Sequence, residues 1–363
     1  MIFCGYERGV NTMRIPGAVL QQRLQESGMS RKELAQRTGV TEKHISTVIN
    51  GEKGISTSFA RKLGYVFDDA TFWLTVQAEY DADQARIKEE NAITAEETSV
   101  LKPLHDIIAY FIEQDYMHND CGDPSKVMQL REFLNVSDLR LIPEITYNAA
   151  YRVQLASNVK VDPYVLFAWQ RLCEKKTEQL SVCADLDTKR LKGRLQEIKQ
   201  MMFGSINQGI HDLQQFFAEC GIAFQVVKNF RGAPVQGFIK QTADHRLILC
   251  MTIRRQRADI FWFTLFHEIA HILNGDYSTR FVDFDSVQNS TEVKADAFAR
   301  DILIDPKQYR AFLQLDDCTS WRAIEDFAAT MQVKPFIVLG RLQSDGILDW
   351  SEYSDKVVRY TWS

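Results

Sequence analysis

A short run near residue 270 has the residue types and the spacing of a metal site. His267 and His271 are four positions apart in the sequence HEIAH. If this run is helical, both imidazoles leave the same face and can bind one Zn²⁺ ion. Glu268 then lies about 100° around the helix axis from His267. A carboxylate in that place can act as a general base toward an activated water. The pattern therefore predicts a zinc site with an adjacent base.

A catalytic zinc site needs three protein ligands and one position open to water. Glu292 and Asp296 follow in STEVKADAFARDILIDP, four residues apart, so on a helix they share one face. We expect Glu292 to be the third ligand. Asp296 is expected to accept a hydrogen bond from the free ring N–H of a liganding histidine. Taken separately, the two patterns also describe a helix with partly buried histidines and a solvated carboxylate pair.

Together, HEIAH, the later E-x-x-A-D-x-F-A pattern and the Leu/Ile-rich turn with Pro306 resemble the ImmA/IrrE metallopeptidases. The resemblance covers roughly residues 160–350. It implies a zincin-like domain in which His267, His271 and Glu292 are the zinc ligands and Glu268 is the catalytic residue. Several members of that family cleave a DNA-binding repressor, but these motifs do not identify a substrate.

The expected scaffold of this site is a small sheet followed by the HEIAH helix. Residues 222–227, 235–240 and 245–253 are short β-rich runs separated by turns that contain Gly, Pro or Asp. They predict a small antiparallel sheet. An exposed edge of such a sheet could hold an extended peptide by strand addition. The preceding residues, 99–205, have the apolar spacing of helices for most of their length.

The N-terminal part of the chain combines helical periodicity with basic charge. Residues 14–62 contain nine Lys or Arg and four Glu, whereas the whole chain has a formal net charge of −5. Pro16 can open a first helix, and Ser30 and Thr41 can cap the next two, with Gly39 in the turn between them. Helix, glycine turn and helix indicate a helix-turn-helix motif. The second helix of such a pair lies in the major groove of DNA.

The side chains expected to face DNA are basic, acidic or short and polar, and can reach base edges or phosphates. They are Arg31, Lys32, Thr41, Glu42, Lys43, His44, Ser46 and Thr47. A small helical bundle with a basic face but no DNA partner is the alternative. We favour DNA binding because the turn, the caps, the apolar spacing and the charge agree.

Residues 15–81 also resemble the HigA-type antitoxins of the Xre-like helix-turn-helix class. The matching segments are IPGAVL, SRKELAQRTGVTEKHISTVINGEKGIS and FWLTVQAEYD. The resemblance implies a five-helix DNA-binding domain, operator binding as a homodimer, and a partner toxin encoded nearby. Operator DNA and a toxin or repressor protein are therefore the expected partners.

Composition places the chain among ordinary globular proteins. Hydrophobic residues make up 45% and charged residues 25% of its 363 residues. No apolar run approaches the roughly 18 residues that span a membrane, and the first residues do not have the pattern of a signal peptide. The seven cysteines are scattered and contain no CxxC pair. Reduced thiols and a cytoplasmic location are therefore expected.

We expect an α+β protein, mainly α with a small antiparallel sheet, in three parts. These are a helix-turn-helix domain (1–90), a helical middle region (91–205) and a metallopeptidase-like domain (206–363). Three functions remain open: an antitoxin-type regulator that carries a zinc peptidase domain, a protease that the DNA module only localises, and a non-catalytic protein with a structural zinc. Structural zinc is normally closed by four protein ligands. The three candidate ligands and the neighbouring Glu268 favour an open site.

Overall fold

The computed structural model describes residues 14–67, 69–119, 122–145, 150–153, 161–182, 185–204, 206–242, 245–278 and 288–361. Residues 1–13, in which we expect no signal peptide, lie outside the described residues. The chain divides into two compact units, Met1–Ala95 and Glu96–Ser363. No helix among the described residues is long and apolar enough to cross a membrane.

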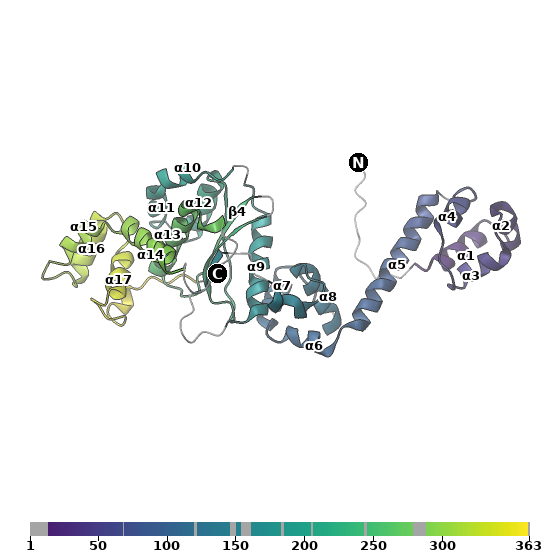
Figure 1. Ribbon diagram of the computed structural model, residues 1–363, viewed down its shortest axis with the longest axis horizontal. Coiled ribbons are helices and arrows are strands. Elements are labelled where there is room, and N and C mark those ends of the chain that lie inside the picture. Colours follow the sequence, from purple (N-terminus) through teal and green to yellow (C-terminus); the bar gives the residue numbers. More distant parts are fainter. Residues whose placement is uncertain are drawn as a thin grey trace. The chain divides into compact units, whose positions relative to one another are not determined.

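The first unit contains the five helices that the sequence predicts (Figure 1). They are α1 (Pro16–Glu26), α2 (Arg31–Thr38), α3 (Glu42–Ile49), α4 (Thr57–Gly64) and α5 (Ala70–Ala92). The predicted caps are confirmed, because the hydroxyl of Ser30 accepts from the N–H of Glu33 and that of Thr41 from the N–H of His44. Gly39 has φ +63°, a left-handed conformation that makes the turn between α2 and α3.

Apolar side chains from all five helices form one core in this unit. Leu20, Leu34, Ile45, Phe59 and Trp73 are each at most 2% exposed. After Tyr80, α5 continues as one helix to Ala92. Its second half is rich in Ala, Gln, Glu, Lys and Arg, which have high intrinsic helix propensity. The helix therefore extends beyond the apolar face that packs on the core.

The rest of the chain is mainly helical, as predicted. Its helices are α6 (Ala95–Thr98), α7 (His105–Glu113), α8 (Asp123–Leu134), α9 (Pro163–Glu178), α10 (Thr188–Gly193), α11 (Leu195–Met201), α12 (Ile206–Glu219), α13 (Ala258–Asn274), α14 (Gln288–Leu303), α15 (Pro306–Phe312), α16 (Trp321–Thr330) and α17 (Pro335–Ser344). Asp162 begins α9 as expected, because its carboxylate accepts from the N–H groups of Tyr164 and Val165.

The second unit holds a four-stranded sheet with strand order β1-β3-β4-β2. The strands are β1 (Ala150–Val153), β2 (Ile222–Val226), β3 (Val235–Gln241) and β4 (Leu247–Met251). The prediction of an antiparallel sheet is wrong in one pairing, since β2 and β4 are parallel. The antiparallel β3–β4 hairpin places β4 between β3 and β2. Because β3 and β4 run in opposite directions, β2 cannot be antiparallel to both of them, and it runs parallel to β4, the strand beside it.

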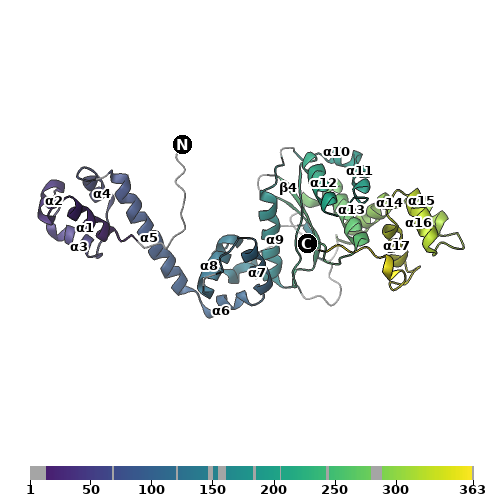
Figure 2. The ribbon, with the colours of Figure 1, turned by 180° about the vertical axis from the view of Figure 1, so that it is seen from behind.

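The sheet lies between α9 on one face and α13 on the other (Figure 2). Neighbouring residues of β3 show this, because side chains alternate between the faces of a strand. The ring of Phe238 lies 5.6 Å from that of Trp169 in α9, whereas Gly237 faces Glu268 in α13. The sheet thus supports α13, the helix that carries the HEIAH motif.

Candidate metal centre and nucleic-acid interface

The HEIAH motif lies in the middle of α13, which is buried for most of its length. Leu265, Ile269 and Ile272 are fully buried and anchor the helix, as the sequence predicts. Gly275 ends the helix with φ +80°, the left-handed cap expected after Asn274. Burial on this scale fixes the rotation of the helix, and with it the direction of both imidazoles.

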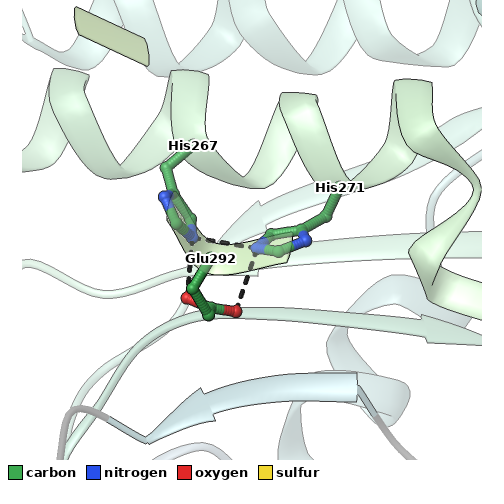
Figure 3. Close-up of side chains that lie close together, drawn as sticks. All are labelled: His267, His271 and Glu292. Atoms are coloured by element: carbon green, nitrogen blue, oxygen red, sulfur yellow. Dashed lines mark hydrogen bonds and ion pairs between the residues drawn. The ribbon is translucent and has the colours of Figure 1, made fainter. Parts of the chain in front are cut away.

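The three predicted ligands come together in the structure (Figure 3). Nε2 of His267 lies 2.9 Å from Nε2 of His271. The Glu292 carboxylate lies across both rings, with Oε2 at 3.4 Å from Nε2 of His267 and Oε1 at 3.3 Å from Nε2 of His271. Among the described residues these side chains form a group whose ligand atoms all lie within 4.8 Å of one another. Ala295 and Ala299 are fully buried and hold α14 so that Glu292 reaches this point.

The other nitrogen of each imidazole faces a carboxylate. Nδ1 of His267 lies 2.8 Å from Oδ1 of Asp296, the partner that the sequence suggested. Nδ1 of His271 lies 3.0 Å from Oδ2 of Asp276, which we did not predict. The signal for Asp276 was its place directly after the Asn274-Gly275 cap, because a left-handed residue turns the chain back toward the last helical turn. With Nδ1 occupied in this way, Nε2 of each ring is directed at the centre of the cluster.

The cluster is strongly acidic around His271. Burial lowers the pKa of this imidazole, but the hydrogen bonds to Glu292 and Asp276 and the charge of Glu268 outweigh burial and raise it to about 9. In the metal-free protein a proton on His271 therefore provides the positive charge that these carboxylates stabilise. A divalent cation would provide the same compensation.

Glu268 is 2% exposed and lies directly against the backbone of β3. A Cβ atom placed on Gly237 would lie 2.2 Å from Oε1 of Glu268 and 2.6 Å from its Cγ. The missing side chain at position 237 therefore makes the space in which the Glu268 carboxylate sits. Sequence reasoning did not identify this role of Gly237, because it depends on the contact between a strand and a helix that are distant in the sequence.

The donor set fits Zn²⁺ with three protein ligands. Ligand atoms bonded to zinc at about 2.0–2.1 Å in tetrahedral geometry lie about 3.3 Å apart. Each histidine Nε2 lies at about that distance from one oxygen of Glu292, His267 at 3.4 Å from Oε2 and His271 at 3.3 Å from Oε1, whereas the two histidine nitrogens lie closer together, at 2.9 Å. His267 and His271 of α13 and Glu292 of α14 would hold the ion, and Glu268 of α13 lies next to His267 in the sequence.

The expected DNA-facing residues are exposed to different degrees. Those at the start of the two helices are exposed, and those farther along α3 are half-buried. The exposed residues are Arg31, Lys32, Thr41, Glu42 and Lys43, and the half-buried ones are His44, Ser46 and Thr47. The His44 ring packs edge-on against Phe59 at 5.0 Å, so this residue also has a packing role.

A contact between the two helices adds to this surface. Nη1 of Arg31 in α2 lies 3.5 Å from Oγ of Ser46 in α3. The Thr41 hydroxyl is used as the α3 cap. In α3, the exposed cationic side chain is that of Lys43. In α2, the exposed cationic residues Arg31 and Lys32 lie at the start of the helix.

Comparison with known proteins identifies the first unit. The helix-turn-helix family model matches residues 20–64, which confirms the predicted motif. A curated relative, virulence-associated protein A′ of Dichelobacter nodosus, is 39% identical over 71 residues, or 19% of this chain. The match spans 62% of that relative's length.

Several solved structures are also similar to part of the chain. PA4674 of Pseudomonas aeruginosa, solved in complex with its 18-bp operator DNA, is 33% identical over 20% of this chain and 78% of its own, with a TM-score of 0.19. The antitoxin HigA of the same organism, solved with the higBA promoter, is 31% identical over 22% of this chain and 90% of its own, with a TM-score of 0.21. An addiction-module antidote protein of the HigA family from Coxiella burnetii is 27% identical over 22% and 88%, with a TM-score of 0.21.

Proposed function

We propose that this protein is a DNA-binding transcriptional regulator of the antitoxin type whose second unit is a zinc-dependent metallopeptidase. For the first unit, the supporting observation is the helix-turn-helix motif with Lys43 exposed on its second helix. A cationic side chain at this position of a recognition helix reaches the edge of a guanine or a phosphate. The excess of basic residues over residues 14–62 supplies the general attraction to DNA.

For the second unit, the convergence of His267, His271 and Glu292 carries the proposal. Two imidazole nitrogens and one carboxylate leave a fourth position for water, the arrangement of catalytic zinc. Glu268 adds a general base with almost no exposure to bulk solvent. A purely structural zinc would not need this buried carboxylate beside its ligands.

The chain's own groups then divide the work of peptide hydrolysis. Zinc, when bound, supplies a Lewis acid that polarises the scissile carbonyl and increases the acidity of water. As the oxygen of the attacking water bonds to the carbonyl carbon, Glu268 takes a proton from that water. It then delivers that proton to the nitrogen of the leaving amine as the C–N bond breaks. Asp296 and Asp276 orient the two imidazoles and do not touch the peptide.

The protein partner is a toxin or a repressor, and the DNA partner is the protein's own operator, bound by a homodimer. The resemblance of residues 15–81 to HigA-type antitoxins supports the operator, the homodimer and a toxin, and the resemblance of residues 160–350 to the ImmA/IrrE metallopeptidases supports a repressor. The buried base beside the ligands favours catalysis over a domain that only binds its partner.

DNA binding is tested by a mobility shift of the full chain on the DNA upstream of its own reading frame. Lys43→Ala should weaken binding, and affinity should fall steeply with salt because bound counterions are released from the DNA. Lys102→Ala is the matched control, since Lys102 is also exposed but lies outside the helix-turn-helix unit. If Lys43→Ala and Lys102→Ala bind the DNA with equal affinity, the DNA-binding surface does not include Lys43.

A further inference from the structure

One edge of β3, the strand against which Glu268 packs, is occupied by a segment of the same chain. β1 pairs with β3 in antiparallel register, with Ala150 opposite Ile239, Tyr151 opposite Phe238 and Arg152 opposite Gly237. The register shifts between Arg152 and Val153. Because β4 occupies the other edge of β3, the two hydrogen-bonding edges of β3 are both used where these strands overlap.

This pairing lies beside the candidate metal centre. Gly237, the residue of β3 against which Glu268 packs, is the partner of Arg152. Adjacent strands lie about 4.8 Å apart, so the backbone of β1 runs one strand spacing from the backbone that touches the proposed general base. Figure 3 shows a short pale blue strand on the side of α13 where Glu292 lies.

An extended peptide that adds to β3 at this edge needs the same backbone hydrogen-bonding groups that β1 uses. Strand addition obtains its affinity from main-chain hydrogen bonds, and one edge can pair with only one strand. A segment tethered to the same chain has an effective concentration on the order of mM. A free partner at lower concentration therefore competes poorly with β1 unless its side chains make further contacts.

We propose that residues 150–153 are a tethered occupant of the peptide-binding edge of β3, and that a partner peptide binds this edge only after β1 leaves. This inference rests on the proposed function, in which the second unit binds an extended protein segment beside the metal. The partner is then an extended segment of a protein chain that is recognised through its backbone. β1 also covers an edge that would otherwise be open to aggregation.

The test uses the full chain with Glu268→Gln, so that binding is measured without cleavage. In this background, Tyr151→Pro with Arg152→Pro removes two strand N–H groups. Tyr151→Ala with Arg152→Ala is the matched control, because it changes the same side chains and keeps both N–H groups. The probe is a fluorescently labelled synthetic peptide with the sequence of residues 146–157.

The proline variant should bind the probe at least tenfold more tightly than the alanine variant. Without the probe, the amides within Val235–Ile239 that face β1 should exchange hydrogen faster in the proline variant, and addition of the probe should slow them again. Equal affinity of the two variants, or unchanged exchange in β3, would overturn the proposal. To show that the proline variant is folded, its zinc content and the amide exchange of α13 should equal those of the alanine variant.

A second measurement needs no change in β1. In the Glu268→Gln chain, a large excess of the isotope-labelled probe should speed amide exchange at residues 150–153 by displacing β1. If the amides of residues 150–153 exchange at the rate of an unstructured chain both with and without the probe, the proposal is contradicted. Cleavage within residues 146–157 by the wild type but not by Glu268→Gln would also contradict it, because β1 would then be a substrate. None of these binding measurements depends on turnover, so a failure of peptidase activity is distinguishable from a failure of this inference.

Discussion

Two carboxylates outside the candidate ligand set orient the two imidazoles. Asp296 faces Nδ1 of His267, and Asp276 faces Nδ1 of His271. Each contact selects the ring orientation in which Nε2 points at Glu292. The ligand types and Asp296 could be predicted from i, i+4 spacing alone, since that spacing defines a helix face. Asp276 could not be predicted in this way, because its position depends on the turn that follows the helix.

The proposed zinc site gives a prediction at the level of single residues. Purified protein should contain about one Zn²⁺ per chain, and His267→Ala or Glu292→Ala should lose most of it. Glu268→Gln should retain it, and Asp296→Ala should weaken affinity about 10–100-fold because only the ring orientation is disturbed. Metal analysis after dialysis measures this, with His245→Ala as the control for an exposed histidine. Full zinc retention by Glu292→Ala would remove Glu292 from the ligand set.

At the level of elements, predictions succeed where local sequence decides the structure. Residue types at fixed positions determine the caps of α2 and α3, the start of α9 at Asp162 and the end of α13 at Gly275. Strand neighbours are a different case. The parallel β2–β4 pair and the four-residue β1 depend on contacts between distant segments. A strand as short as β1 also shows too few alternations to be recognised.

The contact between β3 and α13 gives a prediction at this level. Gly237→Ala should displace the Glu268 carboxylate, because the new Cβ would lie 2.2 Å from Oε1. Cleavage should fall about 100-fold, the cost of misplacing a reacting group by about 1 Å. Zinc content should remain near the wild-type value. Gly193→Ala is the control, since no atom lies within 4 Å of a Cβ there. Full cleavage activity in Gly237→Ala would show that the placement of Glu268 does not matter.

At the scale of the whole molecule, the chain has two units with separate hydrophobic cores. The core of the first unit includes Leu34 and Trp73, and that of the second includes Leu265 and Ile269. The formal net charge of −5 hides the excess of basic residues within residues 14–62, so the total charge is a poor guide to DNA binding. The charge within residues 14–62 is the informative quantity, and the sequence is sufficient to find it.

Separate cores predict separate unfolding. Calorimetry of the full chain should show two transitions, and zinc should raise the melting temperature of only one of them. At a free zinc concentration 100 times the dissociation constant, the stabilisation should be about 2.7 kcal/mol. A chelator should reverse it. A fragment of residues 1–95 should give the zinc-insensitive transition by itself. A single transition that shifts as a whole with zinc would contradict this description.

The most direct test of the central claim is whether Glu268 is needed for cleavage of a partner protein. The zinc-loaded chain is incubated with the protein encoded beside it, and separately with an intact copy of residues 1–95, and the products are identified by mass spectrometry. We predict fragments with the wild type and none with Glu268→Gln, although both proteins contain zinc. If both leave the same intact proteins, the metal centre is a binding site and the peptidase assignment is wrong.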